Sequence, residues 1–89
     1  MIYYSKDIQK LFRKGHLPKE IADIFVNTFK ALDLTKDLNI FDVKKLHTEN
    51  KIDYYRLRKG KYRAIFYIQN NDYFVIAISK REEVYKKWL

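Results

Sequence analysis

Residues 54–69 read YYRLRKGKYRAIFYIQ and decide the fold of this chain. Arginine and apolar residues alternate along the first part, which is the period of a half-buried strand. Gly60 supplies the positive φ that a two-residue hairpin turn needs. We predict the turn at Lys59-Gly60, which pairs Arg56 with Arg63. The arginines then share one face of the hairpin, and the other face carries Tyr55, Leu57, Ala64 and Phe66.

The strand after this hairpin is placed by the same reasoning. Residues 73–80 are rich in β-formers, and Asn70-Asn71-Asp72 are turn residues. A three-residue loop pairs Gln69 with Tyr73 and Arg63 with Ser79, whereas a two- or four-residue loop would slip the register by one and mix the faces. We therefore predict an apolar sheet face made of Ala64, Phe66, Ile68, Phe74, Ile76 and Ile78.

The opposite face of this predicted sheet is strongly basic. Arg56, Arg58, Arg63 and Arg81 converge around Ser79. Like charges that face each other destabilise a sheet by up to about 1 kcal/mol. A planar guanidinium donates two hydrogen bonds at once, which suits phosphate. The pattern favours an anion-binding site, and the alternative is a solvated face without function.

Length and composition limit the classes of protein. Eighty-nine residues predict a single domain, residues 1–89, and the net charge of +8 favours a polyanionic partner such as RNA, DNA, anionic lipid or an acidic protein. The sequence predicts neither a membrane span nor a secretory signal. It contains no cysteine, which excludes disulfides and thiol catalysis and favours the cytoplasm.

The N-terminal half predicts two helices. Ser5 is a good helix cap, and Gly15 ends the first helix. The second helix is predicted from Pro18 to about Leu34, with an apolar stripe at helical spacing. This stripe comprises Ile21, Ile24, Phe25, Thr28, Phe29 and Leu32. The first helix has an apolar stripe of its own, made of Ile8, Leu11 and Phe12. A helical hairpin laid on the apolar sheet face would bury both stripes.

The remaining segments complete the predicted α+β fold. Met1–Tyr4 and Phe41–Leu46 are short candidate strands, and the tail, Glu82–Leu89, is compatible with a helix. We predict an N-terminal helical hairpin on a twisted antiparallel sheet of three to four strands, followed by a short C-terminal helix.

Several familiar catalytic arrangements are missing from the sequence. His16 and His47 fall in predicted loops far apart, and both are expected at the surface. No spacing of His, Cys, Asp or Glu resembles a metal site, so we expect no metal and no cofactor. The two glycines, Gly15 and Gly60, cannot form a glycine-rich phosphate loop.

Two motifs together resemble the RelE/ParE superfamily of toxins from toxin–antitoxin pairs. They are YRLRKGKYRAIFY at residues 55–67 and ISKREEVY at residues 78–85. The resemblance implies a RelE-like endoribonuclease that cuts messenger RNA on the ribosome, inhibits translation and is restrained by a cognate antitoxin. Because this chain is basic, we expect an acidic, amphipathic antitoxin segment.

The resemblance also implies roles for individual residues. The catalytic set would be Arg56, Arg63, Arg81 and Tyr85, and RNA-binding residues would be Tyr54, Arg58, Lys59, Lys61 and Lys80. Where the family often has two lysines on the first of these strands, this chain has Tyr54 and Arg56, and the histidine or glutamate of some relatives has no counterpart. Tyr85 is the candidate acid or base; it would alternatively stack on an RNA base or pack the tail helix.

Two other functions remain open at the level of sequence. ParE-like members of the superfamily poison DNA gyrase, and a degenerate member would bind only its antitoxin or nucleic acid. Arg81 followed by Val84-Tyr85 favours the ribonuclease, because a gyrase inhibitor does not need this set.

Overall fold

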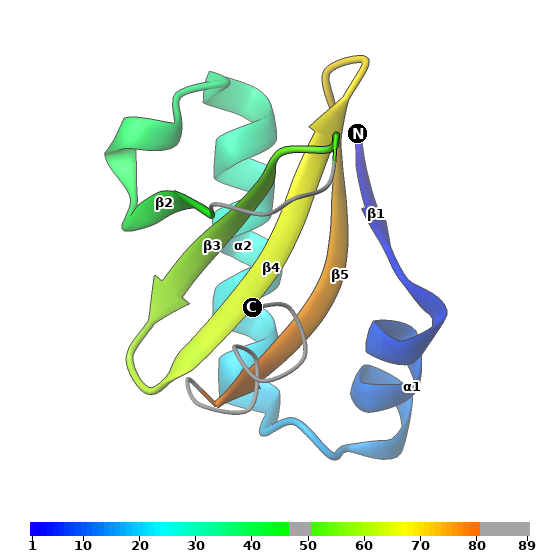
Figure 1. The fold of residues 1–89 in the computed structure, drawn as a ribbon. Helices are drawn as coiled ribbons and strands as arrows, with labels where there is room; N and C mark the ends of the chain where they lie inside the picture. Colours follow the sequence, from blue (N-terminus) through cyan, green and yellow to red (C-terminus); the bar gives the residue numbers. More distant parts are fainter. Residues whose placement is uncertain (47–50, 81–89) are drawn as a thin grey trace.

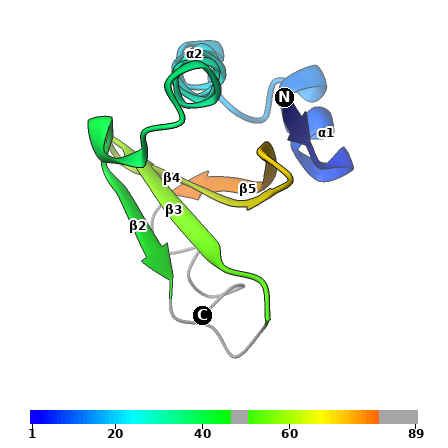
Figure 2. The ribbon, with the colours of Figure 1, turned by 90° about the horizontal axis from the view of Figure 1, so that it is seen from above.

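The protein is an α+β fold with two helices on one face of a five-stranded sheet (Figures 1 and 2). The computed structural model describes residues 1–46 and 51–80. Along the chain lie β1 (Ile2–Tyr4), α1 (Lys6–Lys14), α2 (Lys19–Thr35), a short 3-10 helix (Leu38–Ile40), β2 (Val43–Leu46), β3 (Tyr54–Lys59), β4 (Tyr62–Gln69) and β5 (Asp72–Lys80). The predicted tail helix, Glu82–Leu89, lies outside the described residues.

The sheet is larger than predicted, and it is mixed. Its strand order is β1-β5-β4-β3-β2, and β1 pairs in parallel with β5 while the other neighbours are antiparallel. The predicted sheet of three to four antiparallel strands did not include a parallel neighbour of β5, although Met1–Tyr4 was a candidate strand and is confirmed as β1. Its three residues are too few to show a period, so sequence alone could not assign its partner or direction.

Local capping explains where α1 begins and ends. The Ser5 side chain accepts a hydrogen bond from the backbone N–H of Ile8, which satisfies one free donor of the first turn. Gly15 adopts the left-handed conformation with φ of 68°, which ends the helix. Both boundaries agree with the prediction, and Ile8 is the buried residue of this helix.

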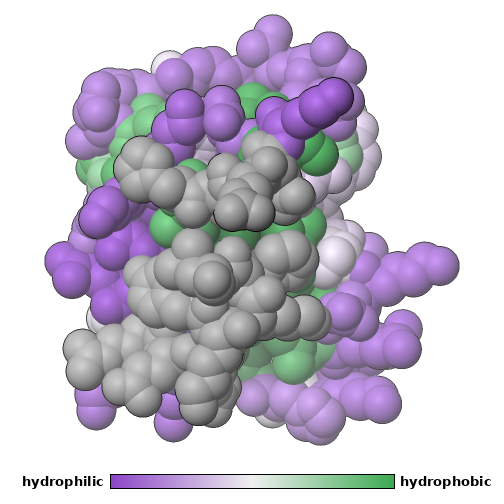
Figure 3. Space-filling model, in the orientation of Figure 1, coloured by the Kyte–Doolittle hydropathy of each residue, from purple (hydrophilic) through white to green (hydrophobic). Residues whose placement is uncertain are grey.

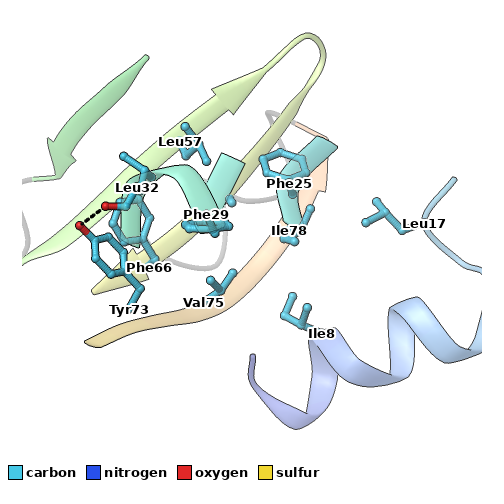
Figure 4. Packing of buried hydrophobic residues seen from close by; sticks show 11 residues of the cluster. Ile8, Leu17, Phe25, Phe29, Leu32, Leu57, Phe66, Tyr73, Val75 and Ile78 are labelled. Carbon is cyan, nitrogen blue, oxygen red and sulfur yellow. Dashed lines mark hydrogen bonds between the residues drawn. The ribbon is translucent and has the colours of Figure 1, made fainter. Parts of the chain in front are cut away.

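The core lies between α2 and the helix-facing side of the sheet (Figure 4). Phe25, Phe29 and Leu32 on α2 are fully buried, and the Tyr73 hydroxyl donates to the Leu32 carbonyl at 3.4 Å. Burying one such large apolar side chain contributes about 1.5–3 kcal/mol. Ile24, predicted for the same stripe, is 42% exposed instead. From the sheet, the core receives Leu57, Ala64, Phe66, Tyr73, Val75 and Ile78.

The β3–β4 hairpin turns one residue later than predicted. Gly60 and Lys61 form the turn, Lys59 pairs with Tyr62, and Arg58, rather than Arg56, lies opposite Arg63. The glycine has φ of 59°, the conformation for which the sequence singled it out. Moving the turn by one residue shifts the pairing by two. Because the two sheet faces alternate with period two, the arginines keep the predicted face.

The β4–β5 hairpin differs more from the prediction. Its loop has two residues, Asn70 and Asn71, both with positive φ, as a two-residue type I′ turn requires. Near this turn, β5 is therefore out of the predicted register by one residue. Phe66 pairs with Val75, and Phe74 lies on the sheet face opposite the helices, next to Tyr67.

A β-bulge restores the predicted register further along β5. The pairing passes from Phe66–Val75 to Ile65–Ala77, so Ile76 is the extra residue. Beyond it, Ala64 pairs with Ile78 and Arg63 with Ser79, as predicted. The expectation that Phe74 and Ile76 belong to the core under α2 was wrong, and Tyr73 and Val75 occupy those positions.

Tyr4 offers a test of the packing between β1 and the helices. Its ring makes edge contacts with Phe12 and Phe29, and its buried hydroxyl has no hydrogen-bond partner among the described residues. Burial raises the pKa of Tyr4 to about 12. An unpartnered buried hydroxyl is unfavourable by about 1–3 kcal/mol, so Tyr4→Phe should be neutral or stabilising at pH 7.

The advantage of Tyr4→Phe should grow at alkaline pH. Tyr4 in the unfolded chain ionises near its ordinary pKa, about 10, before the folded form does at about 12. The wild-type protein therefore loses up to about 2 kcal/mol of stability between these values, and the variant does not. Urea unfolding of both proteins at pH 8 and pH 11 measures the difference. If the stability difference between wild type and Tyr4→Phe is the same at pH 8 and pH 11, this account of Tyr4 is wrong.

Candidate functional site

The sheet face opposite the helices carries a compact set of basic side chains. The strand register places Lys44, Arg56, Arg58 and Arg63 on this face, and these four residues are called the basic cluster below. Lys44 lies opposite Arg56, and Arg58 opposite Arg63. Figure 3 views the molecule from this side; outside the grey residues, hydrophilic residues lie around the rim and hydrophobic residues show towards the middle.

Arg63 is the most buried member of the basic cluster. Only 6% of it is exposed, although arginine is rarely buried to this extent. Its Nη1 donates to the carbonyls of Gly60 and Tyr62 at 3.0 and 3.1 Å, so the adjacent turn fixes the guanidinium. Its Nε is buried without a partner in the described part of the chain. A buried arginine that no carboxylate in the described ranges neutralises is a fixed positive charge.

Arg56 and Arg58 share one counter-ion, Asp42. Arg56 Nη2 donates to Asp42 Oδ1 at 2.8 Å, and Arg58 Nε pairs with Asp42 Oδ2. The Arg56 side chain is only 13% exposed, whereas that of Arg58 is 52% exposed. Asp42 was not predicted as a site residue, because it lies in the predicted strand Phe41–Leu46, whose register with β3 was not known.

The structure brings only some of the predicted site residues together. Tyr54 lies on the same face as Arg56 and Arg58, and its ring meets that of Tyr67 edge to face at 5.9 Å. Lys59 points to the opposite, helix-facing side, with its ammonium 4.6 Å from the centre of the Phe41 ring. Lys61 is exposed in the β3–β4 turn.

Three predicted site residues remain, Lys80, Arg81 and Tyr85. Lys80 pairs with Tyr62 on the helix-facing side and lines a shallow cleft beside His16 and Leu17. Arg81 and Tyr85, both predicted to be catalytic, lie outside the described residues. Lys44 was not predicted as a site residue, although its alternate position in the Phe41–Leu46 stretch could have indicated its face.

A row of aromatic side chains adjoins the basic cluster on the same face. Tyr3 stacks on Phe74 at 5.1 Å between ring centres, Phe74 stacks on Tyr67 at 4.9 Å, and Tyr67 meets Tyr54. The row crosses β1, β5, β4 and β3. Sequence reasoning placed Phe74 in the core and so missed the row, which depends on the two-residue Asn70-Asn71 turn.

Among residues 1–46 and 51–80, no group of three or more His, Cys, Asp or Glu side chains could hold a metal ion. Within the same residues, no helix is long and apolar enough to cross a membrane.

Solved structures with a similar fold exist. The chain matches a chain of the RelB–RelE antitoxin–toxin complex from Methanococcus jannaschii with a TM-score of 0.73 and 20% identity, covering 98% of this chain and 99% of the other. It also matches a chain of the archaeal RelE–RelB complex from Pyrococcus horikoshii OT3 with a TM-score of 0.72 and 25% identity, covering 91% and 93%. No protein-family model and no curated protein matches the sequence.

Proposed function

Since this chain has the RelE-like fold, we propose that it is the toxin of a toxin–antitoxin pair and a ribosome-dependent, metal-free endoribonuclease that cleaves messenger RNA. The observation that carries the proposal is the convergence of Arg56, Arg58 and Arg63 on one sheet face. Fixed guanidinium groups suit a reaction whose transition state gains negative charge on phosphate.

The proposed reaction is attack of a ribose 2′-hydroxyl on the adjacent phosphate. A base must accept the hydroxyl proton, cations must hold the dianionic phosphorane, and an acid must protonate the leaving 5′-oxygen. Arg63 is suited to the phosphorane, because the two carbonyls that hold its Nη1 orient the guanidinium before substrate arrives. The sequence resemblance assigns Arg81 to the same charge and Tyr85 to proton transfer.

The other members of the basic cluster have a binding role in this proposal. Arg56 is largely buried and holds the scissile phosphate, while the exposed Arg58 and Lys61 contact neighbouring phosphates of the RNA. The cluster contains no histidine or carboxylate that could accept the hydroxyl proton. We therefore expect slow cleavage of free RNA, and rapid cleavage only where the ribosome positions the substrate.

The proposed partners follow from fold and charge. Both similar structures are complexes of RelE with RelB, so we propose a cognate antitoxin for this chain as well. The net charge of +8 makes an acidic antitoxin segment the complementary partner. Ribosomes and messenger RNA are the other proposed partners, which would place the toxin in the cytoplasm.

Mapping the 5′ ends of cellular messenger RNA after brief induction of the protein tests the proposal. We expect new ends inside translated codons within minutes, and none when translation initiation is blocked beforehand. DNA breaks with intact messenger RNA would contradict the proposal and indicate a gyrase inhibitor. Expression without toxicity and without cleavage would indicate a protein that only binds its antitoxin or nucleic acid.

Tyr85→Phe separates proton transfer from stacking. The variant keeps the ring and removes only the ionisable hydroxyl, so a role in acid–base chemistry predicts a single-turnover cleavage rate lower by about 10²–10⁴. Ribosome binding, measured by co-sedimentation, should be unchanged. Full activity of the variant would leave stacking on an RNA base, or packing, as the role of Tyr85.

A further inference from the structure

Asp42 is the carboxylate that contacts the basic cluster in the described part of the chain. It bridges two guanidinium groups, those of Arg56 and Arg58, through its two carboxylate oxygens. The two arginines alternate along β3 on one sheet face, and without a counter-ion they would repel each other. The Asp42 side chain is 40% exposed, so the bridge lies at the accessible surface of the proposed RNA-binding face.

The backbone around Asp42 is fixed from several directions. The Arg58 N–H donates to the Asp42 carbonyl at 3.0 Å, which extends the pairing of β2 with β3 by one residue. The Val43 N–H donates to the Phe41 carbonyl at 2.9 Å, and the Phe41 ring packs on the core under the Lys59 ammonium. The backbone therefore holds Asp42 at a position from which its carboxylate reaches both arginines.

This geometry affects which guanidinium edges remain for RNA. Asp42 engages Nη2 of Arg56 and Nε of Arg58, while Nε of Arg56 is buried without a partner in the described residues. One donor edge of each arginine is thereby fixed in direction, and the remaining N–H groups keep a defined orientation. At the same time, the negative charge of Asp42 opposes the approach of RNA phosphates in the ground state.

We propose that Asp42 is a positioning residue, which orients Arg56 and Arg58 for the transition state and lowers the affinity of the face for RNA in the ground state. The proposal rests on the proposed ribonuclease function. An interaction that weakens binding of the ground state and orders groups for the transition state raises both kcat and KM. Removing Asp42 should therefore lower both kcat and KM, whereas a merely structural residue would lower kcat without tightening RNA binding.

Asp42→Asn is the decisive variant, because asparagine keeps the shape and removes the charge. Asp53→Asn is the matched control, since Asp53 also forms an ion pair on the sheet, with Lys45 at 3.4 Å, but does not touch the arginines. We expect Asp42→Asn to lower kcat of ribosome-dependent cleavage by about 10–100-fold. Asp42→Glu retains the charge and should recover part of the rate.

Equilibrium binding of a labelled single-stranded RNA at several salt concentrations gives the second measurement. Asp42→Asn should bind about 3–10-fold more tightly, with a salt slope steeper by about 0.7 for each additional phosphate that the protein neutralises. We expect the Arg58 Nε–H signal in NMR spectra to be resolved in the wild-type protein and in Asp53→Asn, and to merge with the other arginine signals in Asp42→Asn. This signal reports positioning without any cleavage.

The outcomes separate this proposal from the proposed function. If Asp42→Asn binds RNA more tightly and cleaves at the wild-type rate, or if it matches Asp53→Asn in both assays, the positioning role is wrong. Equal losses of RNA affinity and rate would also overturn it, because they indicate a structural defect. A wild-type protein that binds RNA but never cleaves it contradicts the ribonuclease instead, and the NMR signal and the RNA affinity then still decide the role of Asp42.

Discussion

Replacing Phe66 with alanine should lower the free energy of unfolding by about 3–5 kcal/mol, the largest loss of stability that we expect from a single truncation. Phe66 is completely buried. Its ring meets Phe29 of α2 edge to face at 5.2 Å and stacks between Tyr55 and Tyr73 at 5.5 and 5.9 Å. Alanine would leave a cavity between three rings that neighbouring backbone elements hold in place, and such a site collapses poorly.

Phe74→Ala is the matched control for this prediction. The two phenylalanines lie on adjacent strands, but Phe74 is half-buried on the opposite sheet face, between Tyr67 and Tyr3. Its truncation should cost about 1–2 kcal/mol, in proportion to the smaller area removed from water. Urea unfolding followed by circular dichroism measures both losses. Equal losses would contradict the assignment of Phe66 to the core and Phe74 to the open face.

Arg63→Lys should lower the single-turnover rate of messenger RNA cleavage by about 10²–10³, the effect typical of losing one fixed donor to a developing charge. Lysine keeps the positive charge but has no planar fork. Its ammonium can replace Nη1 at the carbonyls of Gly60 and Tyr62, and then no rigid second edge is left for phosphate. RNA affinity, which depends mainly on net charge, should change much less.

Arg13→Lys is the control for the replacement of an arginine by a lysine as such. Arg13 is exposed in the last turn of α1 and belongs to no proposed site. The control should cleave at the wild-type rate, and thermal unfolding should show that Arg63→Lys remains folded at the assay temperature.

The resemblance gives Arg81 a similar role, so Arg81→Ala should show the same pattern with unchanged ribosome binding. A wild-type rate for Arg63→Lys would remove Arg63 from the proposed chemistry.

The face that carries the arginines was predictable from sequence, because it depends only on whether the register shifts by an odd or an even number of residues. The β3–β4 turn begins one residue later than predicted, yet Arg58 and Arg63 still share a face, since the resulting shift of two residues leaves every side chain on its side. The helix boundaries at Ser5 and Gly15 were predictable because capping is local.

The register of β5 and the contacts of Asp42 were not predicted, because both depend on non-local pairing. A loop of Asn70 and Asn71 alone, compensated by a bulge at Ile76, gives the same register at Arg63 as the predicted three-residue loop. The two asparagines suit a two-residue type I′ turn, but no local signal marks the bulge at Ile76 that such a turn requires here. The position of Phe74 depends on which loop forms. Asp42 was missed for the same reason, because its contacts with β3 arise from pairing between distant segments.

The bulge at Ile76 also has an evolutionary consequence. It divides β5 into two stretches whose alignments with β4 are independent, one near the Asn70-Asn71 turn and one near Arg63. A lineage that gains or loses one residue in that turn can compensate by losing or gaining the bulge, while the pair Arg63–Ser79 stays in place. The distal end of the sheet, with its aromatic row, can therefore diversify in length and composition under selection that leaves the arginines unmoved.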